Sequence, residues 1–196
     1  MINLVFFGPP GSGKGTQAQY IARSLHLNHI STGDIFRKNI QNKTSLGIAA
    51  EEYIKDGKLV PDDLTINLLS NEIDNFSNSS GFIFDGFPRT VLQAESFDEL
   101  LKEKDMSISY VFSLEVSENE LVKRLLLRGI TSGRSDDRNE NIIRNRIQVY
   151  HDQTSILVDF YLNSIENRFI SINGEQDIKL ISKQIMMNID EFNPNT

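Results

Sequence analysis

One short segment of the chain combines glycine, proline and lysine where packing alone would favour bulkier residues. Residues 8–17 read GPPGSGKGTQ and follow directly on the apolar run 2–7. The segment fits the pattern G-x-x-x-x-G-K from Gly8 to Lys14, with a strand expected before it and a helix after it. Glycines let successive backbone N–H groups face a phosphate, and the start of the helix adds positive partial charge. The spacing therefore predicts a phosphate-binding loop.

Polar side chains of this segment have separate expected roles. We expect Lys14 to reach the β and γ phosphates of a nucleotide, and Thr16 to offer a hydroxyl to the shell of a Mg²⁺ ion. Gly15 stands where the plain pattern has Ser or Thr, and Thr16 follows one position later. Asp85 closes the apolar run 81–84 and has the place of an acid that orients water around Mg²⁺. The alternative to a phosphate-binding loop at residues 8–14 is a glycine turn that only allows close packing of the strand against the helix.

Arginines recur downstream in short polar motifs. These motifs are STGDIFR at 31–37, DGFPRTVLQA at 85–94, RLLLR at 124–128, GRSDD at 133–137 and RNR at 144–146. Planar guanidinium groups bind phosphate oxygens bidentately, which lysine cannot do. Arg124 and Arg128 are four residues apart on an expected helix and could also form an ordinary solvated face. Asp136 and Asp137 could clamp a closed lid or cap the following helix, and we predict that they cap the helix.

Composition excludes several other functions. The 196 residues carry a formal charge of −7, so neither nucleic acid nor an anionic membrane is an expected partner. The chain has no cysteine, which excludes disulfides, thiolate zinc sites and cysteine nucleophiles. The three histidines show no metal-ligand spacing, and we expect them to be structural. The first residues lack a basic leader, and no apolar stretch approaches membrane length, so we expect a cytoplasmic protein.

The elements that must position these motifs alternate along the chain. Short runs rich in Val, Ile and Phe alternate with stretches of helical period, which predicts an α/β fold of βαβ units around a parallel sheet. Strands are expected at 2–7, 28–30, 81–84, 108–115 and 168–172. Helices are expected at 14–25, 34–40, 45–56, 62–76, 91–103, 117–127, 139–164 and 176–189. The inserts 31–60 and 128–138 lack strands and are candidates for moving flaps.

In order along the chain, these motifs resemble those of the adenylate kinase family, from residue 2 to about 189. The resemblance implies a P-loop NTPase-like domain over 1–196, with a five-stranded parallel sheet flanked by helices. It implies a helical AMP-binding insert at 31–60 and a short lid at 128–138, and without cysteine this lid carries no zinc. The implied reaction is reversible, Mg²⁺-dependent phosphoryl transfer from ATP to AMP, giving two ADP. We expect a monomer whose partners are these nucleotides.

The resemblance also assigns residues to each nucleotide. ATP is assigned to Gly11, Ser12, Gly13, Lys14, Gly15, Thr16, Arg124, Arg128 and Gln176. AMP is assigned to Thr32, Arg37, Lys58, Leu59, Val60, Gly86, Phe87, Pro88, Arg89, Gln93, Arg134 and Arg146. The catalytic set is Lys14, Asp85, Arg89, Arg124, Arg134 and Arg146. Because the stretch 137–146 is one residue longer than in many relatives, Arg144 stays an alternative to Arg146.

The charges of the two substrates agree with this assignment. ATP and AMP together bring about six negative charges at neutral pH, and Mg²⁺ offsets only part of them, so one lysine and six arginines have a clear use. The AMP phosphate is already ionised at neutral pH and needs no general base. Catalysis then consists of alignment and charge stabilisation. Closure of the two inserts would exclude water as a competing acceptor.

Two other functions remain open from the sequence. A UMP/CMP kinase resembles this family closely, but there the positions of Thr32 and Thr90 are typically alanine and asparagine. Gln93 offers an amide that can pair with the donor and acceptor edge of adenine, which favours AMP. A nucleotide-sensing module without turnover is the second alternative. The second phosphate cage argues against it, because a sensor does not need one.

Overall fold

The computed structural model describes residues 1–76, 79–165 and 168–192. Its centre is a parallel sheet with the strand order β2-β3-β1-β4-β5. The strands are β1 (Ile2–Phe7), β2 (Asn28–Ser31), β3 (Gly81–Asp85), β4 (Tyr110–Glu115) and β5 (Phe169–Asn173). The predicted α/β fold with a five-stranded parallel sheet is confirmed, and the strand boundaries shift by two residues at most.

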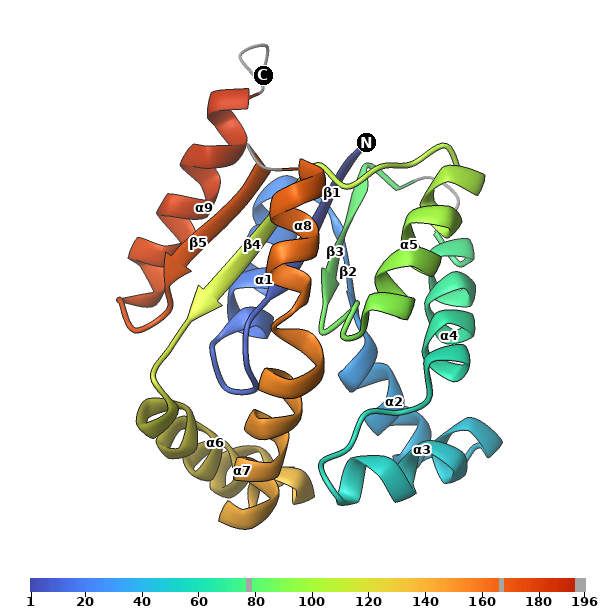
Figure 1. The fold of residues 1–196 in the computed structure, drawn as a ribbon, viewed down its shortest axis with the longest axis vertical. Helices are drawn as coiled ribbons and strands as arrows, with labels where there is room; N and C mark the ends of the chain where they lie inside the picture. Colours follow the sequence, from blue (N-terminus) through green and yellow to red (C-terminus); the bar gives the residue numbers. More distant parts are fainter. Residues whose placement is uncertain (77–78, 166–167, 193–196) are drawn as a thin grey trace.

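Helices cover both faces of the sheet (Figure 1). In β1, Leu4 and Phe6 face the side covered by α1 (Lys14–Leu25) and α9 (Ile178–Phe192). Val5 and Phe7 alternate with them and face the side covered by α4 (Asp62–Asp74), α5 (Val91–Glu103) and α8 (Leu157–Ile165). A strand buried on both faces must be apolar at successive positions, which explains why residues 4–7 of β1 are all hydrophobic.

Two helical inserts project beyond the carboxyl ends of the strands (Figure 1). The first contains α2 (Thr32–Gln41) and α3 (Ser45–Lys55), which have a small core of their own around Phe36 and Ala50. The second, the predicted lid 128–138, contains the end of α6 (Glu118–Ser132) and a 3₁₀ turn at Ser135–Asp137, and α7 (Glu140–Val149) follows it. Both inserts stand beside the phosphate loop, so each can supply side chains to the same space.

Helix boundaries differ most from the sequence prediction at two places, and by up to three residues at several others. Helix α6 continues to Ser132 instead of ending near 127, and the Thr131 and Ser132 hydroxyls donate to carbonyls of the preceding turn. Gly133, with φ 71°, ends it. The single helix predicted over 139–164 is wrong: a π-helical turn at Tyr150–Thr154 separates α7 from α8. Such turns are often found at functional sites.

No helix within the described ranges combines the length and apolarity that crossing a membrane requires.

Candidate active site

A cleft with a cavity volume of about 610 Å³ opens at the carboxyl ends of β1 and β3, between the two inserts. This is the edge where parallel α/β sheets generally bind ligands. All of the predicted site residues line it except Phe87. The Phe87 side chain is 1 % exposed and packs edge-on against Phe97 in the core, so it cannot contact a nucleotide in the cleft. A role for residue 87 would have to come from its backbone.

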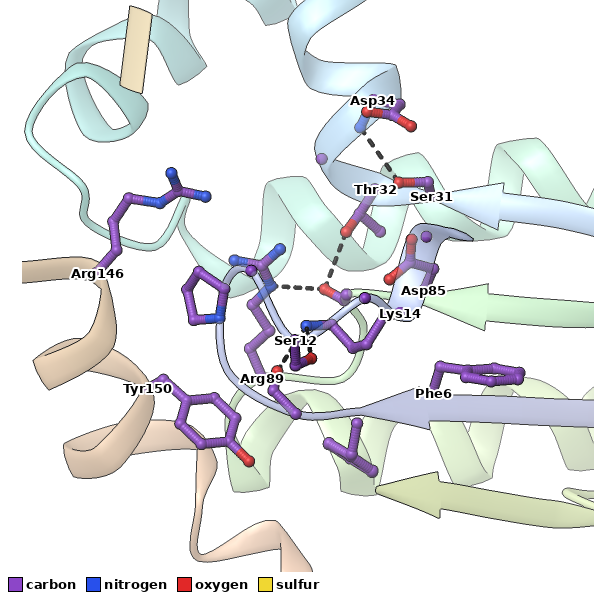
Figure 2. A pocket seen from close by; sticks show the side chains of 18 of the residues that line it. Phe6, Ser12, Lys14, Ser31, Thr32, Asp34, Asp85, Arg89, Arg146 and Tyr150 are labelled. Carbon is purple, nitrogen blue, oxygen red and sulfur yellow. Dashed lines mark hydrogen bonds between the residues drawn. The ribbon is translucent and has the colours of Figure 1, made fainter. Parts of the chain in front are cut away.

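The phosphate loop curls around the ammonium group of Lys14 (Figure 2). The Nζ of Lys14 donates to the carbonyl oxygens of Gly8 at 2.6 Å and Pro9 at 2.9 Å. Gly8 has φ 134°, and a Cβ there would lie 2.6 Å from the Leu114 carbonyl oxygen. Gly13 has φ 101° and leads into α1. The loop therefore needs glycine at these two positions, for space at the first and for backbone conformation at both.

The surroundings of Lys14 disfavour the charged form of its amine. Its pKa is lowered to about 7, because burial opposes the charged form and the nearby Asp85 carboxylate offsets this only in part. Repulsion from Arg89, Arg128 and Arg146 lowers it further. An anionic phosphate beside Nζ would favour the charged form of Lys14 and raise this pKa.

Asp85 ends β3 directly beside the phosphate loop. Its residue is 8 % exposed, and its Oδ2 lies 3.3 Å from the position that a Cβ on Gly15 would take. The Nε2 of His29 on β2 is 3.5 Å from the same oxygen. Carboxylate, hydroxyl and phosphate oxygens are the ligands that Mg²⁺ prefers, usually with several waters retained. Asp85 and the exposed Thr16 therefore fit a hydrated Mg²⁺ bound together with a nucleotide.

Arg89 is held at three separate atoms. Its Nε donates to the Gly86 carbonyl at 2.6 Å, and its backbone N–H donates to Oε1 of Gln93 at 2.8 Å. Its carbonyl accepts from Oγ1 of Thr154 at 2.9 Å. Burial and the nearby Arg146 charge lower the pKa of Arg89 to about 10, so it remains a cation at neutral pH. Thr154 belongs to the π-helical turn and was not predicted, since nothing in the sequence joins it to residue 89.

Asp34 connects the two inserts, and sequence reasoning also missed it. Its Oδ1 accepts from Nη2 of Arg134 at 2.8 Å and from Nη2 of Arg37 at 2.7 Å. Burial alone would raise the pKa of Asp34, but the hydrogen bond and charge of Arg37, together with Arg134, hold it below its usual value. Two arginines assigned to phosphate are therefore held in place by one carboxylate between them.

The prediction that Asp136 and Asp137 cap the next helix is wrong. The cap of α7 is Asn139, whose side chain accepts from the backbone N–H of Asn141. Asp137 is fully buried and accepts from Nε and Nη2 of Arg128 at 2.6 and 3.1 Å. Both aspartates are also bound by Arg146, which lies 3.0 Å from Asp136. The two aspartates form ion pairs instead of caps because each of them faces an arginine from another helix.

The structure separates Arg146 from Arg144. Arg146 lines the cleft, and Figure 2 shows its side chain among those around it. Arg144 is paired with Glu140 and Glu118 on an exposed face and does not line the cleft. Arg124 also lines the cleft, and its Nη1 donates to the Gly174 carbonyl at 2.9 Å. Arg124 therefore lines the cleft and also pairs with Glu120 on its own helix.

Thr32 and Gln93 line a polar part of the cleft, which we call the Thr32–Gln93 pocket. Oγ1 of Thr32 donates to the Gly86 carbonyl at 3.0 Å, and both residues are almost fully buried. The Gln93 amide donates through Nε2 to Oδ1 of Asp62 at 2.6 Å. The Oε1 of the same amide accepts from the backbone N–H of Arg89. One N–H and one lone pair of the amide therefore remain for a ligand.

A phosphate loop with its lysine, facing a cage of arginines across one cleft, defines the protein as a P-loop phosphotransferase of the nucleoside monophosphate kinase class. The family model described as adenylate kinase matches residues 6–166. The chain belongs to the adenylate kinase family.

Curated adenylate kinases match this chain over almost its whole length. An adenylate kinase of Bacteroides thetaiotaomicron is 51 % identical over 89 % of this chain and 90 % of its own. One of Flavobacterium psychrophilum is 48 % identical over 94 % of this chain and 96 % of its own. One of Phocaeicola vulgatus is 45 % identical over 98 % of this chain and 100 % of its own.

Proposed function

We propose that the protein catalyses reversible, Mg²⁺-dependent transfer of the γ-phosphoryl group of ATP to AMP, giving two ADP. The observation that carries this proposal is that one cleft has two cationic ends. Lys14 lies in the phosphate loop at one end, and Arg37 and Arg89 lie near the Thr32–Gln93 pocket at the other. Arg134 from the lid at 128–138 and Arg146 from α7 also line the cleft.

At the donor end, the backbone N–H groups of residues 11–16 and Lys14 would hold the β and γ phosphates. Arg124, Arg128 and the Gln176 loop would border the rest of ATP. When bound, Mg²⁺ would neutralise part of the phosphate charge, held by the Thr16 hydroxyl and by water that Asp85 orients. Gly174, near Gln176, accepts from Arg124, which ties the two parts of the donor end together.

At the acceptor end, Arg37 and Arg89 would bind the AMP phosphate, and Thr32, Gln93 and the backbone of residues 58–60 would enclose the base. A monophosphate ester is ionised at neutral pH because its second pKa is near 6, so its oxygen is a nucleophile without a general base. The protein then has to align the two phosphates and stabilise the charge that moves between them. Arg134 and Arg146 would stabilise that charge.

Water exclusion follows from the contact between the inserts. Water competes with AMP for the γ-phosphoryl group, and an open cleft would hydrolyse ATP. The Asp34 bridge between Arg37 and Arg134 joins the insert at 31–60 to the lid, which would keep water out while both nucleotides are bound. This function predicts that ADP formation depends on AMP and that ATP hydrolysis without AMP is slow.

The experiment is a coupled ADP assay with Mg²⁺, ATP and, side by side, AMP, CMP, UMP and GMP. We expect AMP to be the best acceptor by a wide margin. Lys14→Met protein, purified in parallel, controls for contaminating kinases and should lose activity by roughly 10³-fold. Preference for UMP or CMP would replace the proposed acceptor, and tight nucleotide binding without ADP formation would mean a sensor.

A further inference from the structure

The amide of Gln93 is held by two neighbours that permit only one orientation. Its Oε1 accepts from the Arg89 backbone N–H at 2.8 Å, and its Nε2 donates to Oδ1 of Asp62 at 2.6 Å. A backbone N–H can only donate, and a carboxylate can only accept. If the amide turned over, N–H would face N–H and oxygen would face oxygen. Both neighbours therefore favour the orientation observed.

Asp62 acts on this amide from behind the cleft. It is the first residue of α4, 31 positions before Gln93, and among the described residues it is not one that lines the cleft. Its Oδ1 also accepts from Oγ1 of Thr90 at 3.1 Å. Thr90 in turn accepts from the backbone N–H of Gln93 at 3.1 Å, so its hydroxyl hydrogen is directed to Asp62. The carboxylate is thus fixed by two donors.

The orientation matters because purines differ in the order of their donors and acceptors. A 6-aminopurine presents a donor at N6 and an acceptor at N1, whereas a 6-oxopurine presents an acceptor at O6 and a donor at N1. The free N–H and lone pair of Gln93 can pair with either edge, but the amide must turn over to change from one to the other. If the orientation of the amide is fixed, only one of the two types of purine can pair with it.

We propose that Asp62 determines acceptor specificity by holding the Gln93 amide in the orientation that pairs with a 6-aminopurine and opposes a 6-oxopurine. The inference rests on the proposed function, in which Gln93 faces the acceptor base. Asp62 touches no substrate and works through Gln93, so it is a positioning residue. The Arg89 N–H acts in the same direction, but no substitution other than proline removes it.

The test compares AMP with inosine monophosphate, which has the 6-oxo edge without the 2-amino group of GMP. Asp62→Asn keeps the shape of the side chain but lets it donate or accept, which removes one of the two conflicts of a turned amide. We expect the AMP-to-IMP ratio of kcat/KM to fall about tenfold, the effect of one buried unpaired polar group. Asp62→Ser should change the ratio in the same direction.

Asp63→Asn is the matched control. Asp63 lies in the same first turn of α4 and is exposed, so this variant removes the same charge without touching Gln93. Its AMP-to-IMP ratio should equal that of the unaltered protein. Thermal unfolding by circular dichroism shows whether each variant is folded.

The outcomes separate the two proposals. If the unaltered protein does not phosphorylate AMP, the proposed function fails. If it does, and both Asp62 variants keep the original AMP-to-IMP ratio, the proposed function stands and the specificity role of Asp62 is rejected. Loss of folding in both Asp62 variants would assign the residue to stability and would also reject the specificity role.

Discussion

The two ends of the cleft that we propose to bind phosphate are built in different ways. At the donor end, a continuous segment wraps its own carbonyls around Lys14, and the positions of the atoms follow from glycine backbone geometry. At the acceptor end, Arg89 is held by Gly86, Gln93 and Thr154, which come from different elements. A local loop therefore forms one site, whereas the other exists only after the chain has folded. We therefore expect the two ends to respond differently to changes of pH and to substitutions.

The largest expected difference comes from the guanidinium fork. Arg89→Lys keeps the charge but loses the planar fork and the bond from Nε to Gly86, so we expect the Kd for AMP to rise between about tenfold and a hundredfold. The Kd for ATP should change by less than about twofold, because the donor end is built separately. Isothermal titration calorimetry with each nucleotide alone measures both.

Arg144→Lys is the control for this substitution, since Arg144 lies on an exposed face away from the cleft. It should leave both affinities unchanged. Equal weakening of ATP and AMP by Arg89→Lys would contradict the independence of the two ends.

The second prediction uses pH to distinguish the ends. With a pKa of about 7, Lys14 is largely neutral in the free protein at pH 8.5 and must take up a proton when a triphosphate binds. The Kd for ATP should therefore rise by up to about tenfold per pH unit above 7, until the pKa of the bound form is reached. Calorimetry in two buffers of different ionisation enthalpy should detect uptake of up to about one proton.

AMP binding provides the comparison. Arg89, with a pKa of about 10, stays charged between pH 7.5 and about 9, so the Kd for AMP should be nearly constant there. Proton uptake of the same size with AMP as with ATP would show that the acceptor end also titrates, and it would contradict the assignment to Lys14.

The smallest expected effect concerns Thr154. Thr154→Val removes the hydroxyl that donates to the Arg89 carbonyl and keeps the volume, so we expect the Kd for AMP to rise about fivefold. Thr154→Ser retains the donor and should stay close to the unaltered protein. The hydrogen bond has no positioning role if the two variants bind AMP alike, or if Thr154→Val weakens ATP to the same degree.

Much of the architecture could be predicted because its signals are local. The alternating apolar runs located all five strands, and residues 8–14 indicated a phosphate loop from their own pattern. The family was correct for the same reason, since each motif is a short continuous segment. The prediction that Asp136 and Asp137 cap a helix was wrong because a cap and an ion pair draw on the same residue types.

The contacts that sequence reasoning missed join distant positions. Asp34 meets Arg134 across 100 residues, and Thr154 meets Arg89 across 65. Asp62 meets Gln93 across 31. Asp34 lies within the motif at 31–37, but neither its spacing nor that of Asp62 or Thr154 along the chain points to the partner that each residue contacts.

The amino-acid sequence by itself determined the sheet, the phosphate loop and the supply of arginines, because hydrophobic periodicity and glycine conformation act between near neighbours. Only the tertiary structure decided that Arg146 and not Arg144 lines the cleft, that Asp137 is buried between two arginines, and that the Gln93 amide faces one way. Those outcomes depend on which helix packs beside which. Hydrogen bonds and ion pairs form only once packing has brought their partners within about 3 Å.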